Sequence, residues 1–215
     1  MEDKTMTMIK TNESGRSMIE MLGVLAIIGV LSVGGIAGYS KAMNKFKTNK
    51  VADNVSMLVA NIKTLYAQQN TYKDLENKTA ISMGVVPDEL GTDATSGTLT
   101  DAFSGPVYID ASGSTADDNK AFILVFTKLS REACISLATN DWGSGYSSGL
   151  IAIQADGDDL DAKGGLDSVY IGDAGSDKIA TPGGSTNSVP MSVTKAAEAC
   201  SCKQGNTCSI AWKYY

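Results

Sequence analysis

The sequence of 215 residues contains no histidine, only four cysteines and only four prolines. Without histidine, the chain lacks the most common general base and the most common metal ligand of proteins. Serine–histidine and cysteine–histidine catalytic pairs are therefore excluded, as are zinc sites that need histidine. No proline precedes Pro87, so no proline interrupts a helix in the N-terminal part of the chain.

Long apolar runs are also absent, with one exception near the N-terminus. Met21–Ser40 comprises twenty consecutive uncharged residues, which as a helix is long enough to cross about 30 Å of hydrocarbon. The run is longer than the apolar core of a secretory signal, and no small-residue cleavage site follows it. A single-pass membrane anchor is therefore the better interpretation. The four lysines Lys41, Lys45, Lys47 and Lys50 would favour a cytoplasmic C-terminal side, whereas the cysteines favour export.

The charges are divided between the two ends of the chain, whose net charge is −6. Residues 1–50 contain seven basic and four acidic residues, whereas residues 51–215 contain eleven basic and twenty acidic ones. The lysines at 41–50 are a candidate patch for nucleic acid or anionic lipid. We interpret them instead as the flank of the membrane anchor, so no nucleic-acid partner is expected.

The segment after the apolar run has the pattern of an amphipathic helix. Apolar residues recur at steps of four and three, as on one helix face: Val51, Val55, Leu58, Ile62 and Leu65. With no proline in the way, the sequence predicts a single helix over residues 18–69 that ends at Asn70-Thr71. Its first half is apolar all round and its second half is amphipathic, which is typical of a stem that ends on a globular head.

The residues before the apolar run carry a more specific motif. Gly15-Arg16-Ser17-Met18-Ile19-Glu20, followed by MLGVLAIIGVL, resembles the N-terminus of type IV prepilins. In that family a prepilin peptidase cuts after the glycine, and a glutamate is the fifth residue of the mature chain. Cutting between Gly15 and Arg16 would make Glu20 the fifth residue. The leader of fifteen residues is long, as in the type IVb group.

This resemblance implies an organisation in three parts and a structural function. The parts are a leader (1–15), an N-terminal helix (16–69) and a disulfide-bearing head (70–215). The chain is then expected to be a subunit that polymerises through its helix into a type IVb-like pilus, not an enzyme. A pseudopilin or minor pilin of a type II secretion-like or conjugative system is the alternative.

The resemblance also implies partners and a location. The partners are further copies of the chain, a prepilin peptidase and the inner-membrane pilus assembly machinery, and no cofactor is expected. The prepilin would lie in the inner membrane and the assembled subunit in an extracellular pilus. In the family the first mature residue is often N-methylated, and here that residue would be Arg16.

Glu20 is a costly residue at the edge of an apolar helix. One interpretation is that it only marks the membrane boundary. The other is that its carboxylate pairs with the N-terminal amine of Arg16, and pairing with the amine of a neighbouring subunit would set the axial register of assembly.

The head is predicted to be α+β, with short antiparallel strands laid against the amphipathic half of the long helix. Ser130 is a candidate N-cap for a helix over 131–138, and FILVF at 122–126 is typical of a buried strand. Alternation of Ile210, Trp212 and Tyr214 predicts a half-buried strand at the C-terminus. Further strands are expected at 106–109, 150–153 and 169–171.

Four cysteines in an exported head predict two disulfides, with three possible pairings. Cys200 and Cys202 are too close to bridge easily. Cys202 and Cys208 flank Gly205-Asn206, a natural hairpin turn, and their pairing leaves Cys134 to pair with Cys200. A thiolate metal site made from the same four residues is the alternative, although its spacing matches no usual zinc pattern.

Two further motifs are weighed against simpler explanations. Gly145-Tyr146-Ser147-Ser148-Gly149 fits the G-x-S-x-G nucleophile motif, but with no histidine to activate Ser147 we interpret it as a loop. Four acidic residues cluster in the segment QADGDDLDAKGG and are a weak candidate for calcium: Asp156, Asp158, Asp159 and Asp161. Because their spacing is not that of an EF-hand, a solvated acidic turn is the favoured interpretation, and no metal site is predicted.

Overall fold

The computed structural model describes residues 18–115, 118–143, 145–202 and 207–215. The chain forms two compact units, Met1–Ala42 and Met43–Tyr215. Helix α1, Met18–Tyr66, contributes residues to both units. The uninterrupted helix predicted from the absence of proline is confirmed, and it ends at Tyr66 rather than residue 69 because the next residues turn back. The N–H of Gln69 donates to the carbonyl oxygen of Tyr66 at 2.8 Å, three residues earlier.

The second unit contains a seven-stranded antiparallel sheet and three short helices. The strands are β1 (Gly91–Asp93), β2 (Thr98–Thr100), β3 (Pro106–Ser112), β4 (Ala121–Leu129), β5 (Leu150–Asp156), β6 (Ile179–Ala180) and β7 (Cys208–Tyr214). The helices are α2 (Asn77–Ser82), α3 (Arg131–Ala138) and α4 (Val193–Ala199), with a 3₁₀ turn, η1, at Tyr146–Ser148. The predicted α+β class is confirmed.

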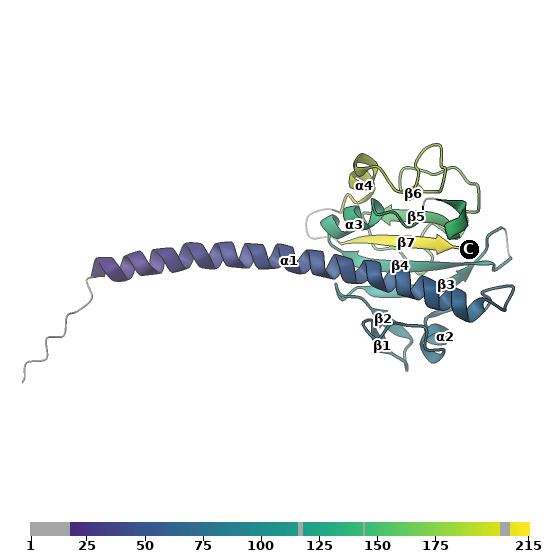
Figure 1. Cartoon of the computed structure of the whole chain (residues 1–215), viewed down its shortest axis with the longest axis horizontal. Helices are drawn as coiled ribbons and strands as arrows, with labels where there is room; N and C mark the ends of the chain where they lie inside the picture. The colour runs from purple at the N-terminus through teal and green to yellow at the C-terminus, as the bar shows by residue number, and fades with distance from the viewer. Residues whose placement is uncertain (1–17, 116–117, 144, 203–206) are drawn as a thin grey trace, which may run out of the picture. The chain divides into compact units, whose positions relative to one another are not determined.

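The strands follow the order β1-β2-β3-β4-β7-β5-β6, so the last strand of the chain lies in the interior of the sheet (Figure 1). Antiparallel pairing places Leu124 of β4 opposite Trp212 of β7. On its other side, β7 pairs with β5, where Ile153 is opposite Trp212. The two halves of the sheet are therefore joined through β7 alone.

One face of the sheet packs against the amphipathic half of α1. Buried α1 residues share a core with alternate residues of the central strands, among them Phe122, Leu124 and Phe126 of β4. The buried α1 residues in this core are Val51, Val55, Leu58, Ile62 and Tyr66. The predicted stripe is therefore right except at its end, where Tyr66 is buried and Leu65 is 40% exposed. Four steps along a helix return closer to the same face than three, which favours Tyr66 after Ile62.

The opposite face of the sheet is also covered. Ala121, Ile123 and Val125 of β4 form a second core with Leu166 and Val169 from the connection between β5 and β6. The strand predicted at 169–171 is wrong, because this connection forms turns. For example, the N–H of Val169 donates to the carbonyl oxygen of Leu166 at 3.1 Å. The predicted buried strand at 122–126 is confirmed, and its continuous apolar run reflects burial on both faces.

The half-buried C-terminal strand predicted from alternation is wrong in one respect. All seven residues of β7 are buried, because the strand has a neighbour on each side and a cover on each face. By contrast, the predicted capping of α3 is confirmed: the backbone N–H of Ala133 donates to the Ser130 hydroxyl oxygen at 3.2 Å.

Candidate functional site

The N-terminal half of α1 exposes apolar side chains all around the helix. Every residue from 18 to 42 is exposed, including Val30 at 75%. Within the described residues, α1 is the one helix long and apolar enough to cross a membrane by length and composition. A surface of this kind is unfavourable in water, so it is suited to lipid or to packing against other helices.

The only acidic residue in this half of the helix is Glu20, which lies in the first turn of α1. A carboxylate at that position interacts favourably with the positive end of the helix dipole. The predicted cleavage residues Gly15 and Arg16 fall outside the described residues, as does the predicted turn at Gly205-Asn206.

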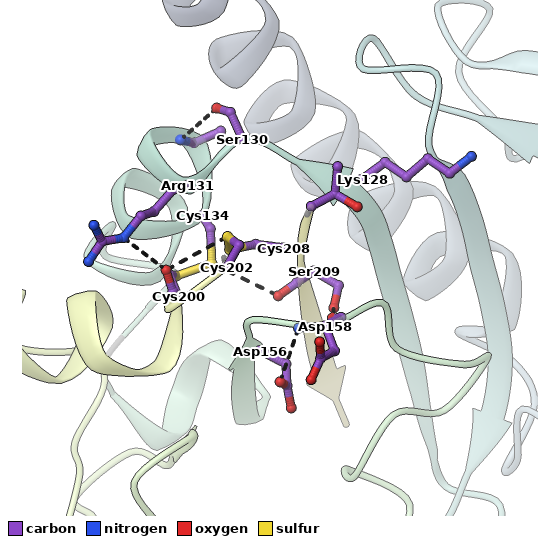
Figure 2. The surroundings of a disulfide bond; sticks show 12 residues. Lys128, Ser130, Arg131, Cys134, Asp156, Asp158, Cys200, Cys202, Cys208 and Ser209 are labelled. Atoms are coloured by element: carbon purple, nitrogen blue, oxygen red, sulfur yellow. Dashed lines mark hydrogen bonds between the residues drawn. A yellow bond between two sulfur atoms is a disulfide. The ribbon is translucent and has the colours of Figure 1, made fainter. Parts of the chain in front are cut away.

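The four cysteines meet where α3, α4 and β7 come together (Figure 2). A disulfide joins Cys134 of α3 to Cys200, the C-cap residue directly after α4, with 5.9 Å between the Cα atoms. A second disulfide joins Cys202 to Cys208 at the start of β7, with Cα atoms 5.4 Å apart. The sulfur atoms of Cys134, Cys200 and Cys208 all lie within 4.8 Å of one another and are buried. Sulfurs held in disulfides are not the thiolates that a metal site requires.

Hydrogen bonds reinforce the same junction between α3 and α4. Nε of Arg131 donates to the carbonyl oxygen of Cys200 at 3.1 Å (Figure 2). Its Nη2 donates to the carbonyl oxygen of Ala197 at 3.3 Å. A cation at the C-terminal carbonyls of a helix satisfies unpaired acceptors and complements the helix dipole. The two helices are thus held by a covalent bond and by a charged group.

The acidic cluster does not converge on a common point. The Asp156 carboxylate pairs with Nζ of Lys178 at 2.8 Å, and that of Asp159 accepts the backbone N–H of Lys128 at 3.2 Å. Asp161 accepts the N–H of Gly164 at 2.8 Å, and Asp158 has an exposed side chain. In the described ranges, the cysteine trio is the one close group of three or more potential metal-ligating side chains.

The match to a known protein family covers the head and the second half of α1. A family model described as PilS N-terminal matches residues 45–213. The chain belongs to the PilS family of type IVb pilins. This pilin is 30% identical over 139 residues to the major structural subunit of the bundle-forming pilus of Escherichia coli O127:H6, covering 64% of this chain and 69% of that protein.

Two further matches, one in sequence and one in structure, come from Vibrio cholerae. The toxin coregulated pilin of serotype O1 is 27% identical over 139 residues, covering 61% of this chain and 59% of that protein. The crystal structure of TcpA, a type IV pilin of the El Tor biotype, has a TM-score of 0.55 at 14% identity and covers 79% of this chain and 99% of that one. The likeness to the TcpA structure shows that the two chains share a fold.

The lysines that follow the apolar run of the pilin are partly engaged with its own head. Nζ of Lys50 lies 2.9 Å from a carboxylate oxygen of Glu89, and Nζ of Lys47 lies 5.5 Å from the centre of the Phe103 ring. Beside Phe103, burial raises the pKa of Asp101 to about 6. Its Oδ1 accepts the N–H of Phe103 at 2.9 Å, while the charge of Lys47 acts to lower that pKa.

Reasoning from the sequence missed Lys213 of the pilin. It lies on the face of β7 opposite Trp212, is 0% exposed, and its Nζ donates to the carbonyl oxygens of Leu166 and Asp167 at 2.9 and 3.0 Å. Burial lowers the Lys213 pKa to about 8, although nearby carboxylates, first that of Asp167, act to raise it. A lysine in an alternating strand normally indicates the solvent face, and no local signal marks it as buried.

The G-x-S-x-G segment of the pilin is a turn, as interpreted from the sequence. Residues Tyr146–Ser148 form η1, and Ser147 is exposed. The hydroxyl oxygen of Ser148 lies 2.8 Å from the carbonyl oxygen of Gly143 and 2.8 Å from that of Gly145, and its single proton is shared between these two acceptors. These are hydrogen bonds that close a turn, and the sequence offers no histidine to activate either serine.

Proposed function

We propose that this chain is the major subunit of a type IVb pilus, which polymerises through the exposed apolar half of α1. The observation that carries the proposal is the continuous exposure of residues 18–42, which contain most of the exposed large apolar side chains among the described residues. At about 25 cal/mol per Å², leaving such a surface in water is strongly unfavourable, so it must be covered either by lipid or by the helices of other subunits. The subunit acts as a building block and not as a catalyst.

The proposed assembly route begins in the inner membrane. There, lipid covers residues 18–42, and a prepilin peptidase removes residues 1–15 by cutting between Gly15 and Arg16. The inner-membrane assembly machinery then transfers the subunit into an extracellular filament, where helices of neighbouring subunits replace the lipid. Because lipid and helices are about equally apolar, specific contacts must favour the filament arrangement.

Glu20 is proposed to supply such a contact. The cut after Gly15 creates an amine on Arg16, and Glu20 lies in the first turn of the helix. An ion pair between Glu20 of one subunit and the amine of another fixes their axial register, because a shifted subunit leaves both charges unpaired among apolar helices. Removing one partner from an ion pair in such surroundings costs about 3–5 kcal/mol. This cost is large enough to favour the subunit position in which the pair is formed over a shifted one.

The test is the variant Glu20→Ala, expressed in a strain with the complete assembly machinery. We expect membrane insertion, cleavage and disulfides to be retained while sheared filaments are lost or sharply reduced. The matched control is Asp53→Ala, which removes an exposed acidic residue from the second half of the same helix and should leave filament yield unchanged.

N-terminal sequencing of subunits from sheared filaments checks the processing step independently. Subunits that begin at Arg16 support the cut after Gly15. Normal filament yield from Glu20→Ala would refute the assembly role of Glu20. If this chain were a minor component of the sheared filaments, the proposal of a major pilin would be wrong.

A further inference from the structure

A pocket of about 490 Å³ lies beside the C-terminal end of α1, within the unit Met43–Tyr215. Its aromatic lining consists of Tyr66, at the end of α1, together with Tyr72 and Tyr215. Its volume lies in the range of small-molecule sites, which is about 300–1,000 Å³. None of the motifs singled out in the sequence falls in this pocket.

The aromatic wall of the pocket is held in place by its neighbours. The ring of Tyr72 lies 5.1 Å from that of Tyr66 and 4.9 Å from that of Phe122, measured between centroids. The backbone N–H of Tyr72 donates to the carbonyl oxygen of Asn119 at 2.7 Å. A wall that is already ordered adds little entropic cost when a ligand binds.

The charge of the pocket is opposite to that of the head. Two lysines, Lys63 and Lys120, line it, and among the residues that the structure describes no aspartate or glutamate side chain does. Residues 51–215 as a whole carry twenty acidic against eleven basic residues. Nζ of Lys63 is positioned by the carbonyl oxygen of Ser148 at 3.1 Å and lies 5.1 Å from the ring centre of Tyr214. The side chain of Lys120 is exposed.

The remaining lining residues are Ala67 and two residues with amide side chains, Gln69 and Asn70. Both are exposed, so each presents one acceptor and two donors toward solvent. The pocket therefore combines flat aromatic surface, paired amide donors and acceptors, and two positive charges. A ligand that uses all three features has an apolar face, hydrogen-bonding groups and a negative charge.

We propose that this pocket binds a carboxylated hexose, such as a uronic acid residue of a glycan. The C–H face of a pyranose ring fits against the ring of Tyr215, which is 52% exposed. The vicinal hydroxyls match the donors and acceptors of an amide, and the carboxylate is neutralised by lysine. An acidic peptide would use the lysines but not the pairing of rings and amides. The pocket is formed within one chain, so binding requires no filament and is tested independently of assembly.

The test uses the full chain in detergent micelles, titrated with methyl glucuronide and with methyl glucoside. These probes differ only at the exocyclic carbon, which is a carboxylate in the glucuronide and a hydroxymethyl group in the glucoside. Binding is followed by NMR chemical shifts or calorimetry. We expect saturable binding of the glucuronide in the millimolar range, because few groups contact the ligand. The glucoside should bind about five-fold more weakly, which is the upper range for one exposed charge pair.

Two lysine variants locate the site. Lys120→Gln should weaken glucuronide binding about five-fold and leave glucoside binding unchanged. Lys73→Gln, at an exposed lysine outside the lining, should change neither.

Three results would overturn the proposal. The first is no saturable binding of the glucuronide by the wild-type chain. The second is an equal loss in Lys73→Gln, which would show non-specific attraction. The third is an aspartate-containing dipeptide that binds as tightly as the glucuronide while the glucoside does not bind, which would show a carboxylate site without sugar recognition.

Discussion

Replacing Cys134 and Cys200 together with alanine should destabilise the head far more than replacing Cys202 and Cys208 together. In the chain-entropy view, a disulfide stabilises by restricting the unfolded chain, and the effect grows with the length of the closed loop. The two bridges join residues 66 and 6 positions apart. These separations correspond to about 4 and about 2 kcal/mol, so we expect the two double variants to differ by about 2 kcal/mol.

The double variants avoid a complication that single variants would introduce. A single replacement leaves one thiol, and the sulfurs of Cys134, Cys200 and Cys208 lie within 4.8 Å of one another. A thiolate so close to the remaining bridge exchanges with it, which would obscure the stability measurement.

The assay is urea unfolding of the full chain in mild detergent, followed by tryptophan fluorescence. Trp212 is 0% exposed, and its ring lies 5.1 Å from that of Trp142, so unfolding changes the surroundings of both indoles. Peptide mapping without reductant first establishes that each variant keeps its remaining bridge. Equal losses in the two double variants, or a larger loss for the short loop, would refute the loop-length argument.

Because Lys213 is buried, we expect the free energy of unfolding of the head to rise with pH between about 8 and 10. The pKa of Lys213 in the folded chain, about 8, lies below the ordinary value of 10.5. Between these values the unfolded chain binds more protons than the folded chain, so a rise in pH favours the folded state. The urea concentration at the midpoint of unfolding should therefore increase with pH, and Lys213→Met should flatten this increase. Asn54 is 1% exposed, and neither its amide nitrogen nor its oxygen has a hydrogen-bond partner. Asn54→Leu should therefore stabilise the head by about 1–2 kcal/mol, measured by the same urea unfolding.

Each of these predictions has a control. Above pH 10 the increase should reverse, because burial raises the pKa of Tyr214 and the unfolded chain then loses its phenolic proton first. A flat wild-type profile from pH 8 to 10 would contradict the role given to Lys213.

The control for Asn54→Leu is Asn61→Leu on the same helix. This second replacement should destabilise the head, since Nδ2 of Asn61 donates to the carbonyl oxygen of Val85 at 2.9 Å. Stabilisation by both asparagine replacements would indicate a general gain from leucine.

Local patterns predicted the elements whose environment is local. The helix over 18–66 follows from composition and the absence of proline, and the helix that begins after Ser130 follows from its cap. The buried strand at 122–126 follows from five consecutive apolar residues.

Features that depend on contacts between distant segments could not be predicted from local sequence patterns. The apolar residues at 169–171 suggested a strand, but they belong to the turn-rich connection between β5 and β6, which covers the second face of the sheet. Lys213 is buried because that connection brings the carbonyl oxygens of Leu166 and Asp167 over it. The pocket lining combines residues 63–72 with Lys120 and Tyr215, and no single stretch of sequence reveals that combination.

The interior position of β7 determines when the head can be completed during synthesis. The ribosome releases residues 208–214 after every other strand, yet these residues bridge β4 and β5. Until they emerge, the β1–β4 and β5–β6 portions remain separate pieces, each with an unpaired edge available to other chains. The head is thus most open to misassociation and proteolysis until β7 is in place between β4 and β5.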